Sequence, residues 1–329
     1  MYKICHFHFS LYYMNTPGWL HHPFTCIYIV LFIIGCTGNF AVIFLIRRCR
    51  QLRGAPIIFL VNLAVVDILV CLTYFPLYIY LSLTQSSMFL LNFHNNNVCI
   101  AAIFWEFQSQ LCSALTIASI NFERCYVLKY PLRVRTVITF KRKLLFTAGI
   151  WVISILCSIH LLCSYPFFTV SDIDEFDMWQ PTTQYIFPAV IVVVSCIITA
   201  VTLIKRIHSN RLQESNQSNV STGNSLRNPK KALKTVIIVA VVFLCMTSPS
   251  AISRFWIIHF GGYYFSTLTW FFFANLLRVS NSCVNPFIYA LMSSSFRSAI
   301  NSTFCCKSDS TNRQNLNFNS RSRPLQNIV

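Results

Sequence analysis

The chain has 329 residues, of which 55% are hydrophobic and 11% are charged, whereas a soluble domain typically carries about a quarter charged residues. This balance excludes a soluble globular domain and makes a lipid bilayer the natural solvent. The net charge is +17, but its distribution argues against nucleic acid as a partner. Lys and Arg gather in alternate connecting segments and near the C-terminus instead of on one phosphate-binding face.

Seven apolar stretches are each long enough to cross the hydrocarbon core, which takes about 20 helical residues. We place them at Phe24–Ile46, Ile57–Leu81, Val98–Val127, Leu144–Tyr165, Thr183–Ile204, Ala232–His259 and Ser266–Met292. They predict an all-α membrane protein, a seven-transmembrane helix bundle over residues 24–292, with an extracellular N-terminus at 1–23. Residues 1–19 lack a cleavable signal pattern, so the first helix is expected to act as its own insertion signal.

Basic residues set the expected orientation. They cluster after the first, third and fifth spans, at Arg47, Arg48, Arg50 and Arg53, at Lys129, Arg133, Arg135, Lys141, Arg142 and Lys143, and at Lys205, Arg206, Arg211, Arg227, Lys230 and Lys231. The positive-inside rule makes these segments and the C-terminus cytoplasmic, next to anionic lipid. An acidic cluster, Asp172, Asp174, Glu175 and Asp177, then lies outside.

Polar landmarks recur at characteristic points of the spans. They are Gly38-Asn39, Asn62-Leu63-Ala64-Val65-Val66-Asp67, Cys99, Glu123-Arg124-Cys125, Trp151, Pro188, Phe243 with Pro249, Asn281-Ser282, and Asn285-Pro286-x-x-Tyr289. In this order and spacing, the chain resembles the rhodopsin-like (class A) G-protein-coupled receptors from Phe24 to Cys306. The resemblance implies a plasma-membrane receptor that binds an extracellular ligand and activates heterotrimeric G proteins, with arrestin and receptor kinases as further partners.

The resemblance assigns a conformational switch to Glu123, Arg124, Phe243, Pro249, Asn285, Pro286 and Tyr289. In this switch, Glu123 holds Arg124 in the resting state, and Arg124 contacts the G protein in the active state. The alternative is that Arg124 only snorkels to the membrane surface at a helix end. Pro188, Pro249 and Pro286 are expected to remove backbone hydrogen bonds and bend their helices, so that the cytoplasmic ends can swing.

A second set of polar residues lies deeper in the bundle. The resemblance implies an allosteric sodium ion, and no other cofactor, at Asp67, Ser113, Asn281, Ser282 and Asn285. An aspartate at mid-bilayer needs a cation, a proton or several hydrogen-bond donors. The alternative is a polar core without an ion.

The predicted ligand-binding residues are Glu106, Arg254, Asn275 and Arg278. Glu106 lies two helical turns after Cys99 and offers a carboxylate to a cationic group of the ligand. Arg278, seven residues before Asn285, is expected to face the same cavity, so Glu106 and Arg278 could instead neutralise each other. Arg254 either contacts an acidic ligand group or snorkels to the interface.

Beyond the seventh span, residues 293–306 are predicted to form a short amphipathic eighth helix, with Cys305 and Cys306 as palmitoylation sites. Residues 307–329 are predicted to be a disordered cytoplasmic tail with candidate kinase sites. The polar stretch Gln213–Asn228 is expected to be mobile.

The chain departs from the family pattern at several points. Cys99 has no cysteine in Phe167–Thr182 to pair with, so its partner is Cys163 or Cys5, or it is free. Thr247 replaces the usual tryptophan of the sixth span, and Cys196 stands where a tyrosine often stabilises the active arginine. These changes put the efficiency of switching in question and leave the fold unaffected.

Other classes of protein fit less well. The seventh span has no lysine for an opsin Schiff base, no internal repeat indicates a transporter, and no enzyme motif is present. The remaining alternative is a seven-helix scavenger or internalising receptor without G-protein coupling. Among ligands, a peptide is favoured because the acidic segment attracts basic partners; a small amine is second.

Overall fold

The structure, a computed structural model, describes residues 18–49, 52, 57–84, 96–130, 133–164, 185–216, 229–260 and 265–304. Over these ranges the regular elements are helices. They are α2 (Gly18–Arg48), α3 (Ile57–Thr84), α5 (Asn96–Lys129), α6 (Val134–Val137), α7 (Phe140–Ser164), α9 (Phe187–Asn216), α10 (Pro229–Phe260), α11 (Phe265–Met292) and α12 (Ser294–Phe304). The predicted all-α bundle with a short C-terminal helix is confirmed.

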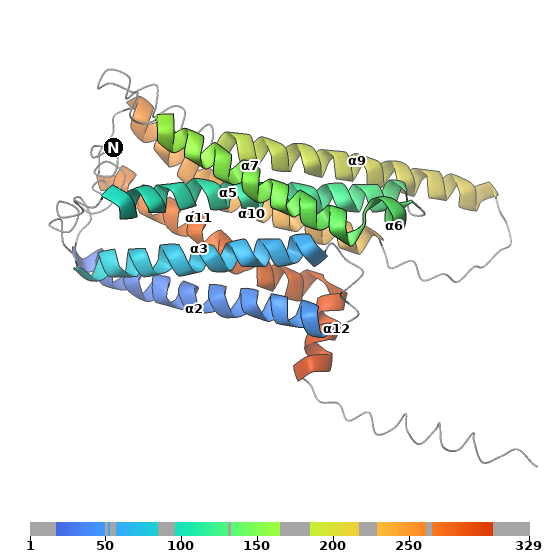
Figure 1. Ribbon diagram of the computed structural model, residues 1–329, viewed down its shortest axis with the longest axis horizontal. Helices are drawn as coiled ribbons and strands as arrows, with labels where there is room; N and C mark the ends of the chain where they lie inside the picture. The colour runs from blue at the N-terminus through green and yellow to red at the C-terminus, as the bar shows by residue number, and fades with distance from the viewer. Residues whose placement is uncertain are drawn as a thin grey trace, which may run out of the picture.

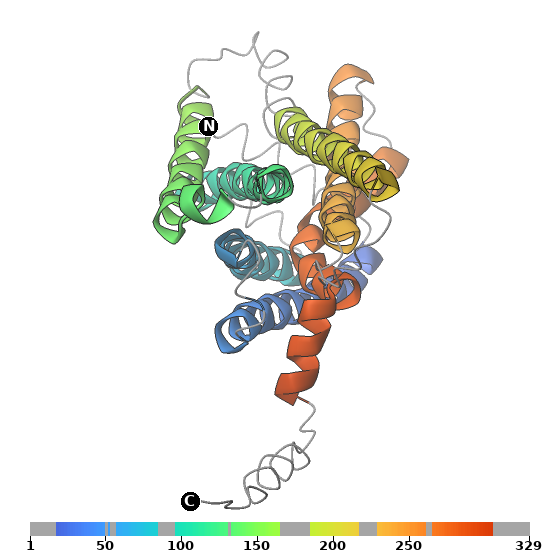
Figure 2. The same ribbon diagram turned by 90° about the vertical axis from the view of Figure 1, so that its right-hand side faces the viewer.

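The long helices lie side by side in one bundle (Figure 1). The helix α5 is central and contacts α3, α7, α9 and α10, while α2 packs against α3 and α11. The view along the bundle shows α12 leaving it at a steep angle (Figure 2), and α12 contacts α11 and α2. Because α5 is central, its polar side chains can meet partners from four other helices.

The bundle is apolar outside and carries many polar side chains inside. Large apolar side chains such as Phe40, Phe44 and Leu156 are exposed, whereas Asn39 and Asn121 are fully buried. By length and composition, four described helices qualify as membrane spans, at His22–Arg48, Ile57–Tyr80, Phe140–His160 and Phe187–Lys205, and α10 has a shorter apolar stretch at Ile237–Ser253. An exposed apolar surface around a polar interior suits a helical bundle in lipid.

Each predicted span falls on one long helix, but the apolar limits and the helix limits differ. The helix α9 continues to Asn216, well beyond the predicted end at Ile204. Hydropathy marks where the hydrocarbon ends, and the polar residues that follow include good helix formers such as Lys, Arg, Leu, Gln and Glu. Residues 213–216 of the predicted mobile stretch Gln213–Asn228 are therefore helical.

The prolines divide into two kinds of position. Pro249 lies inside α10 and Pro286 inside α11, as predicted, and Pro76 lies inside α3. Pro188 is the second residue of α9, and Tyr185 and Ile186, directly before α9, are in π-helix. Residues 183–184 lie outside the described part of the chain, so the predicted effect of Pro188 on its helix stays a prediction.

The helices α2 and α11 approach each other closely at a glycine. A Cβ atom built on Gly38 would lie 3.0 Å from Cγ of Pro286. A larger residue at position 38 would therefore push α2 away from the proline of α11. The glycine of the first-span landmark is explained by this close approach.

Candidate functional site

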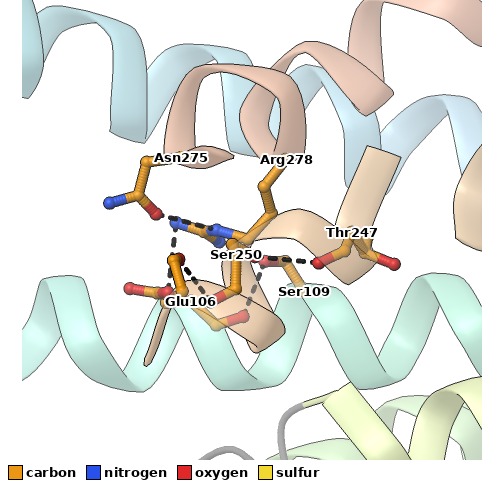
Figure 3. Close-up of polar contacts among 7 residues, drawn as sticks. Glu106, Ser109, Thr247, Ser250, Asn275 and Arg278 are labelled. Atoms are coloured by element: carbon orange, nitrogen blue, oxygen red, sulfur yellow. Dashed lines mark hydrogen bonds and ion pairs between the residues drawn. The ribbon is translucent and has the colours of Figure 1, made fainter. Parts of the chain in front are cut away.

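An ion pair buried inside the bundle joins α5 to α11. The Arg278 Nη2 atom lies 3.1 Å from Glu106 Oε1, and both side chains are 4% exposed. Figure 3 shows the two side chains pointing toward each other across the interior. Of the two predicted roles for Glu106, the structure contains the internal pair with Arg278.

Two neutral groups hold the guanidinium of Arg278 in place. The Nε atom donates to Asn275 Oδ1 at 3.3 Å, and the guanidinium carbon lies 5.6 Å from the ring centroid of Tyr74. A cation over an aromatic face is attracted by the ring quadrupole. Arg278 therefore has a carboxylate, an amide and an aromatic face around it. Sequence reasoning named Asn275 and missed Tyr74, because an aromatic residue in an apolar span gives no signal of its own.

Polar residues of α10 lie next to this pair (Figure 3). The hydroxyls of Thr247 and Ser250 donate to carbonyls of their own helix, at 2.8 Å to Phe243 and 2.9 Å to Thr247. On α5, Ser109 Oγ donates to the carbonyl of Glu106 at 3.2 Å. Thr247, which replaces the usual tryptophan, is thus a small side chain whose hydroxyl is satisfied locally.

Buried polar atoms without partners occur on α3 and α5. Within the described residues, the Tyr74 hydroxyl and Gln110 Nε2 are buried and have no hydrogen-bond partner. Leaving such groups unpaired costs about 1–3 kcal/mol each. Donors of this kind near a buried ion pair are suited to contact with polar groups of a ligand.

Asp67 and Asn285 form a second polar centre. Asn285 Nδ2 donates to Asp67 Oδ2 at 2.8 Å, and Asp67 is 1% exposed. Asp67 Oδ1 is buried and has no hydrogen-bond partner in the described part of the chain. Ser113 and Ser282 are also buried, while Asn281 is half-buried. A buried carboxylate oxygen without a hydrogen-bond partner fits a hard cation such as sodium, which prefers oxygen ligands. That Ser113, Asn281 and Ser282 complete the site stays a prediction.

The other end of α5, predicted to be cytoplasmic, carries Glu123 and Arg124. Within the described residues, Glu123 forms an ion pair with Lys143 of α7, whose Nζ donates to Glu123 Oε1. Arg124 is half-buried. Glu123 thus also contacts a neighbouring helix, and its predicted hold on Arg124 stays a prediction. Lys143 had been predicted only as a basic residue next to the membrane.

The remaining switch residues lie on α10 and α11. Phe243 is buried and Pro286 faces Gly38. The ring of Tyr289 lies 5.5 Å from that of Phe296 on α12. This aromatic contact connects the end of α11 to the short helix α12.

Hydrogen bonds between helices hold α5 against its neighbours. Asn121 Nδ2 donates to Ser195 Oγ at 2.8 Å, and the Thr199 hydroxyl donates to the Asn121 carbonyl at 3.1 Å. Trp151 Nε1 of α7 donates to Asn62 Oδ1 of α3 at 2.8 Å, and Asn62 Nδ2 donates to the Thr116 hydroxyl of α5 at 2.7 Å. Sequence reasoning named Asn62 and Trp151 as landmarks but missed Asn121, since a single asparagine in an apolar span does not reveal which helix it faces.

Several predicted residues lie outside what the structure describes. Cys305, Cys306 and residues 307–329 fall there, as do residues 1–17 and the acidic cluster at 172–177. Cys99 and Arg254 lie in α5 and α10, but their side chains are outside the described set. In the part of the chain that is described, His, Cys, Asp and Glu form no group of three that could hold a metal ion.

The chain is similar to known receptors. Residues 38–289 match the sequence profile of the family described as 7 transmembrane receptor (rhodopsin family). The G-protein coupled receptor 54 of Oreochromis niloticus is 24% identical over 310 residues, which cover 88% of this chain and 79% of the relative. The QRFP-like peptide receptor of Branchiostoma floridae is 22% identical over 327 residues, which cover 91% and 82%. Squid rhodopsin superposes with a TM-score of 0.72 at 19% identity over 94% of each chain, which shows a shared fold.

Proposed function

The chain belongs to the rhodopsin family of seven-transmembrane receptors, and on this premise we propose that it binds an extracellular peptide and activates heterotrimeric G proteins. Family membership makes it a multi-pass receptor of the plasma membrane and not an enzyme. The proposal adds an N-terminus outside the cell, a cytoplasmic C-terminus, and activation by a swing of the cytoplasmic helix ends around Pro249 and Pro286.

The buried pair of Glu106 and Arg278 carries the ligand proposal. Its two charges lie 3.1 Å apart inside the bundle, where charged groups are rare and usually functional. Together with Asn275 and with Arg254 of α10, they form the proposed ligand-binding set. The names of two relatives, a G-protein coupled receptor and a peptide receptor, support the same assignment.

The charge of the pair bears on the ligand class. Glu106 and Arg278 together are neutral, so a lone ammonium entering this buried site adds an uncompensated charge next to Arg278. A peptide end that offers an acceptor to Arg278 and a donor to Glu106 keeps the site balanced. This favours a peptide over a small amine, which remains the second ligand class on the strength of the Glu106 carboxylate.

On the cytoplasmic side, Arg124 is proposed to contact the G protein in the active state. The sodium ion proposed at Asp67 would stabilise the inactive state through Asn285, Ser282, Asn281 and Ser113. Arrestin, receptor kinases and membrane lipid are proposed as further partners, with Cys305 and Cys306 as lipid-modified residues.

The ligand proposal is tested by binding alone, before any signalling is measured. A fluorescent peptide library with varied termini is presented to cells that display wild type, Glu106→Gln/Arg278→Gln or the control Asn301→Ala, at matched surface levels. The double variant removes both charges together, which spares the fold an unpaired buried charge. We expect at least one peptide to bind wild type and the control but not the double variant.

Two results would count against the proposal. Equal binding of every selected peptide to wild type and the double variant would remove Glu106 and Arg278 from the ligand site. A peptide that binds but triggers no nucleotide exchange on any G protein would assign the chain to the alternative class, an internalising or scavenging receptor.

A further inference from the structure

Three tyrosine rings in contact with one another lead from α2 to the buried ion pair of the proposed ligand site. Tyr74 and Tyr78 of α3 are stacked, with ring centroids 6.0 Å apart and planes 14° apart. Tyr78 stacks in turn on Tyr28 of α2, at 5.3 Å and 22°. The guanidinium carbon of Arg278 lies over the ring of Tyr74, 5.6 Å from its centroid. We call Tyr28, Tyr78 and Tyr74 the tyrosine row; it connects α2, through α3, to the cation on α11.

The tyrosine row is buried along its whole length. Tyr28, Tyr78 and Tyr74 are 1%, 4% and 5% exposed. Tyr74 and Tyr78 lie one turn apart on α3, where side chains at i and i+4 are neighbours, and α2 packs closely against α3. Each ring is therefore held by the next one, because a ring can move only into space that its neighbours occupy.

The ion pair and the amide hold only the rim of the Arg278 guanidinium. Glu106 Oε1 lies 3.1 Å from Nη2, and Asn275 Oδ1 accepts from Nε at 3.3 Å. Both contacts are made at nitrogen atoms on the edge of a planar group, and such a group can tilt unless one of its faces is covered. Tyr74 covers a face, and the negative face of its ring attracts the cation.

A further aromatic contact connects the tyrosine row to the helix that carries Arg278. Phe24 of α2 lies 6.4 Å from Tyr28 and 5.6 Å from Phe273 of α11, measured between ring centroids. Phe273 precedes Arg278 by five residues. The aromatic side chains thus pack α2, α3 and α11 into one unit, in which the position of Arg278 depends on residues of two other helices.

We propose that Tyr78 and Tyr28 are positioning residues of the ligand site, which act through Tyr74 to hold Arg278 against Glu106. The positioning rests on the ring contacts and their burial, while its consequence for binding rests on the proposed function. A site whose charged group is already held in place loses less conformational freedom when a ligand binds. Loss of the row should therefore weaken binding although neither tyrosine needs to contact the ligand.

The alternative role of the tyrosine row is to pack α2 on α3 without any effect on Arg278. The two roles predict different stabilities. A residue that only packs contributes the same stability whether or not the charges of Glu106 and Arg278 are present. A residue that positions Arg278 contributes more when the ion pair is present, and non-additivity of stability changes measures such coupling.

The positioning is tested without a ligand, by thermal denaturation of the full-length receptor in lipid nanodiscs. The decrease in denaturation midpoint caused by Tyr78→Leu is measured in wild type and in Glu106→Gln/Arg278→Gln, a background that removes both charges together. We expect the decrease to be about 2–4 °C larger in wild type. Tyr28→Leu, one ring further from Arg278, should show a smaller difference of the same sign. Equal decreases in both backgrounds would overturn the proposal.

Two further variants make this comparison specific. Tyr78→Phe keeps the ring, so it should not produce the difference between backgrounds that Tyr78→Leu produces. Phe59→Leu removes another buried aromatic side chain of α3, whose ring contacts that of Phe146 on α7 at 6.2 Å and which lies about 22 Å along the helix from Tyr74. It should lower the midpoint equally in both backgrounds. A difference as large as that of Tyr78→Leu would mean a global effect of the neutral background and would contradict the proposal.

The consequence for binding is measured with a fluorescent peptide selected on wild type from the library with varied termini. Its dissociation constant is determined on cells that display wild type, Tyr78→Leu, Tyr78→Phe or Phe59→Leu at matched surface levels. We expect Tyr78→Leu to weaken binding about tenfold, while Tyr78→Phe and Phe59→Leu retain the affinity of wild type. Unchanged affinity in Tyr78→Leu would remove the tyrosine row from the ligand site.

The two experiments separate the possible failures. If no peptide binds wild type while the effect of Tyr78→Leu on the midpoint depends on the ion pair, the tyrosine row positions Arg278 and the proposed ligand class is wrong. If a peptide binds through Glu106 and Arg278 while that effect is the same in both backgrounds, the ligand site is correct and the tyrosine row only packs α2 against α3.

Discussion

The helix α5 carries a buried glutamate near each end, and the two are neutralised in different ways. Glu106 pairs with an arginine whose side chain is as deeply buried as its own, at 4% exposure. Glu123 pairs with a lysine that is 18% exposed. The two carboxylates lie about 25 Å apart along the helix. One belongs to the proposed ligand site and the other to the proposed switch.

The difference follows from the chemistry of the two cations. A guanidinium is planar and weakly hydrated, so it can be fully buried with an amide and an aromatic ring around it, as Arg278 is. An ammonium is a compact, strongly hydrated charge on a flexible stem, and Lys143 keeps part of its surface accessible. We call the fully buried pair of Glu106 and Arg278 sealed, because burial holds its side chains in one geometry. The partly exposed pair of Glu123 and Lys143 is called open, because its side chains can exchange partners. The first suits a ligand site and the second suits a switch.

The largest expected effect is at the sealed pair. Glu106→Gln leaves the Arg278 charge buried without its carboxylate, which is expected to reduce the free energy of unfolding by about 3–5 kcal/mol. Thermal denaturation of the receptor in nanodiscs measures the loss. The double variant Glu106→Gln/Arg278→Gln should recover more than half of it. A double variant as unstable as Glu106→Gln would show that packing, and not charge, dominates at this end.

A smaller effect is expected at the support of Arg278. Asn275→Ala removes the acceptor of the Nε–H group, and a hydrogen bond to a charged group contributes about 1.5–3 kcal/mol. Asn275→Gln keeps a neutral amide acceptor and should lose less stability than Asn275→Ala. Thermal denaturation of both variants tests this. Equal losses of stability in both would mean that Asn275 acts through its shape alone.

The hydrogen bond between α5 and α9 should contribute less and should not respond to salt. Asn121→Ala removes the contact with Ser195, a neutral hydrogen bond that contributes about 1 kcal/mol. Denaturation midpoints at low and high salt should show the same loss. A salt-dependent loss would indicate that Asn121 acts through nearby charges and would weaken the contrast between this neutral contact and the ion pair of Glu123, two residues further along α5.

The smallest effect is expected at the open pair. Lys143→Gln should reduce the free energy of unfolding by at most about 1 kcal/mol, the range of partly exposed ion pairs. The loss should shrink as salt rises, because accessible charges are screened over about 10 Å at 0.1 M salt. Glu106→Gln, measured in parallel, should show no such change. The same salt response in both variants would remove the distinction between a sealed and an open pair.

Much of the fold could be predicted from the sequence. Seven apolar stretches could be located because hydropathy reports directly on contact with lipid. The C-terminal end of α9 could not be located in this way, because a helix continues into water where its residues have high helix propensity. The role of Pro188 depends on where its helix begins, and hydropathy does not mark that boundary.

The site was predictable in its residues but less so in its contacts. The positions of Glu106 and Arg278, each seven residues from a landmark, indicated a shared cavity, and they form an ion pair. The partner of Glu123 could not be read from the sequence, because it depends on how closely α7 packs on α5 and where the flexible stem of Lys143 ends. Tyr74 and Asn121 were missed for the same reason, since their partners lie on other helices.

The central claim is that this receptor activates G proteins through Arg124. We would measure ligand-independent nucleotide exchange in cells across a panel of G-protein subtypes, for wild type and Arg124→Ala at matched surface levels. The account predicts exchange by wild type on at least one subtype and its loss in Arg124→Ala. Exchange that is the same in both proteins, or absent from wild type even with a bound peptide, would contradict it.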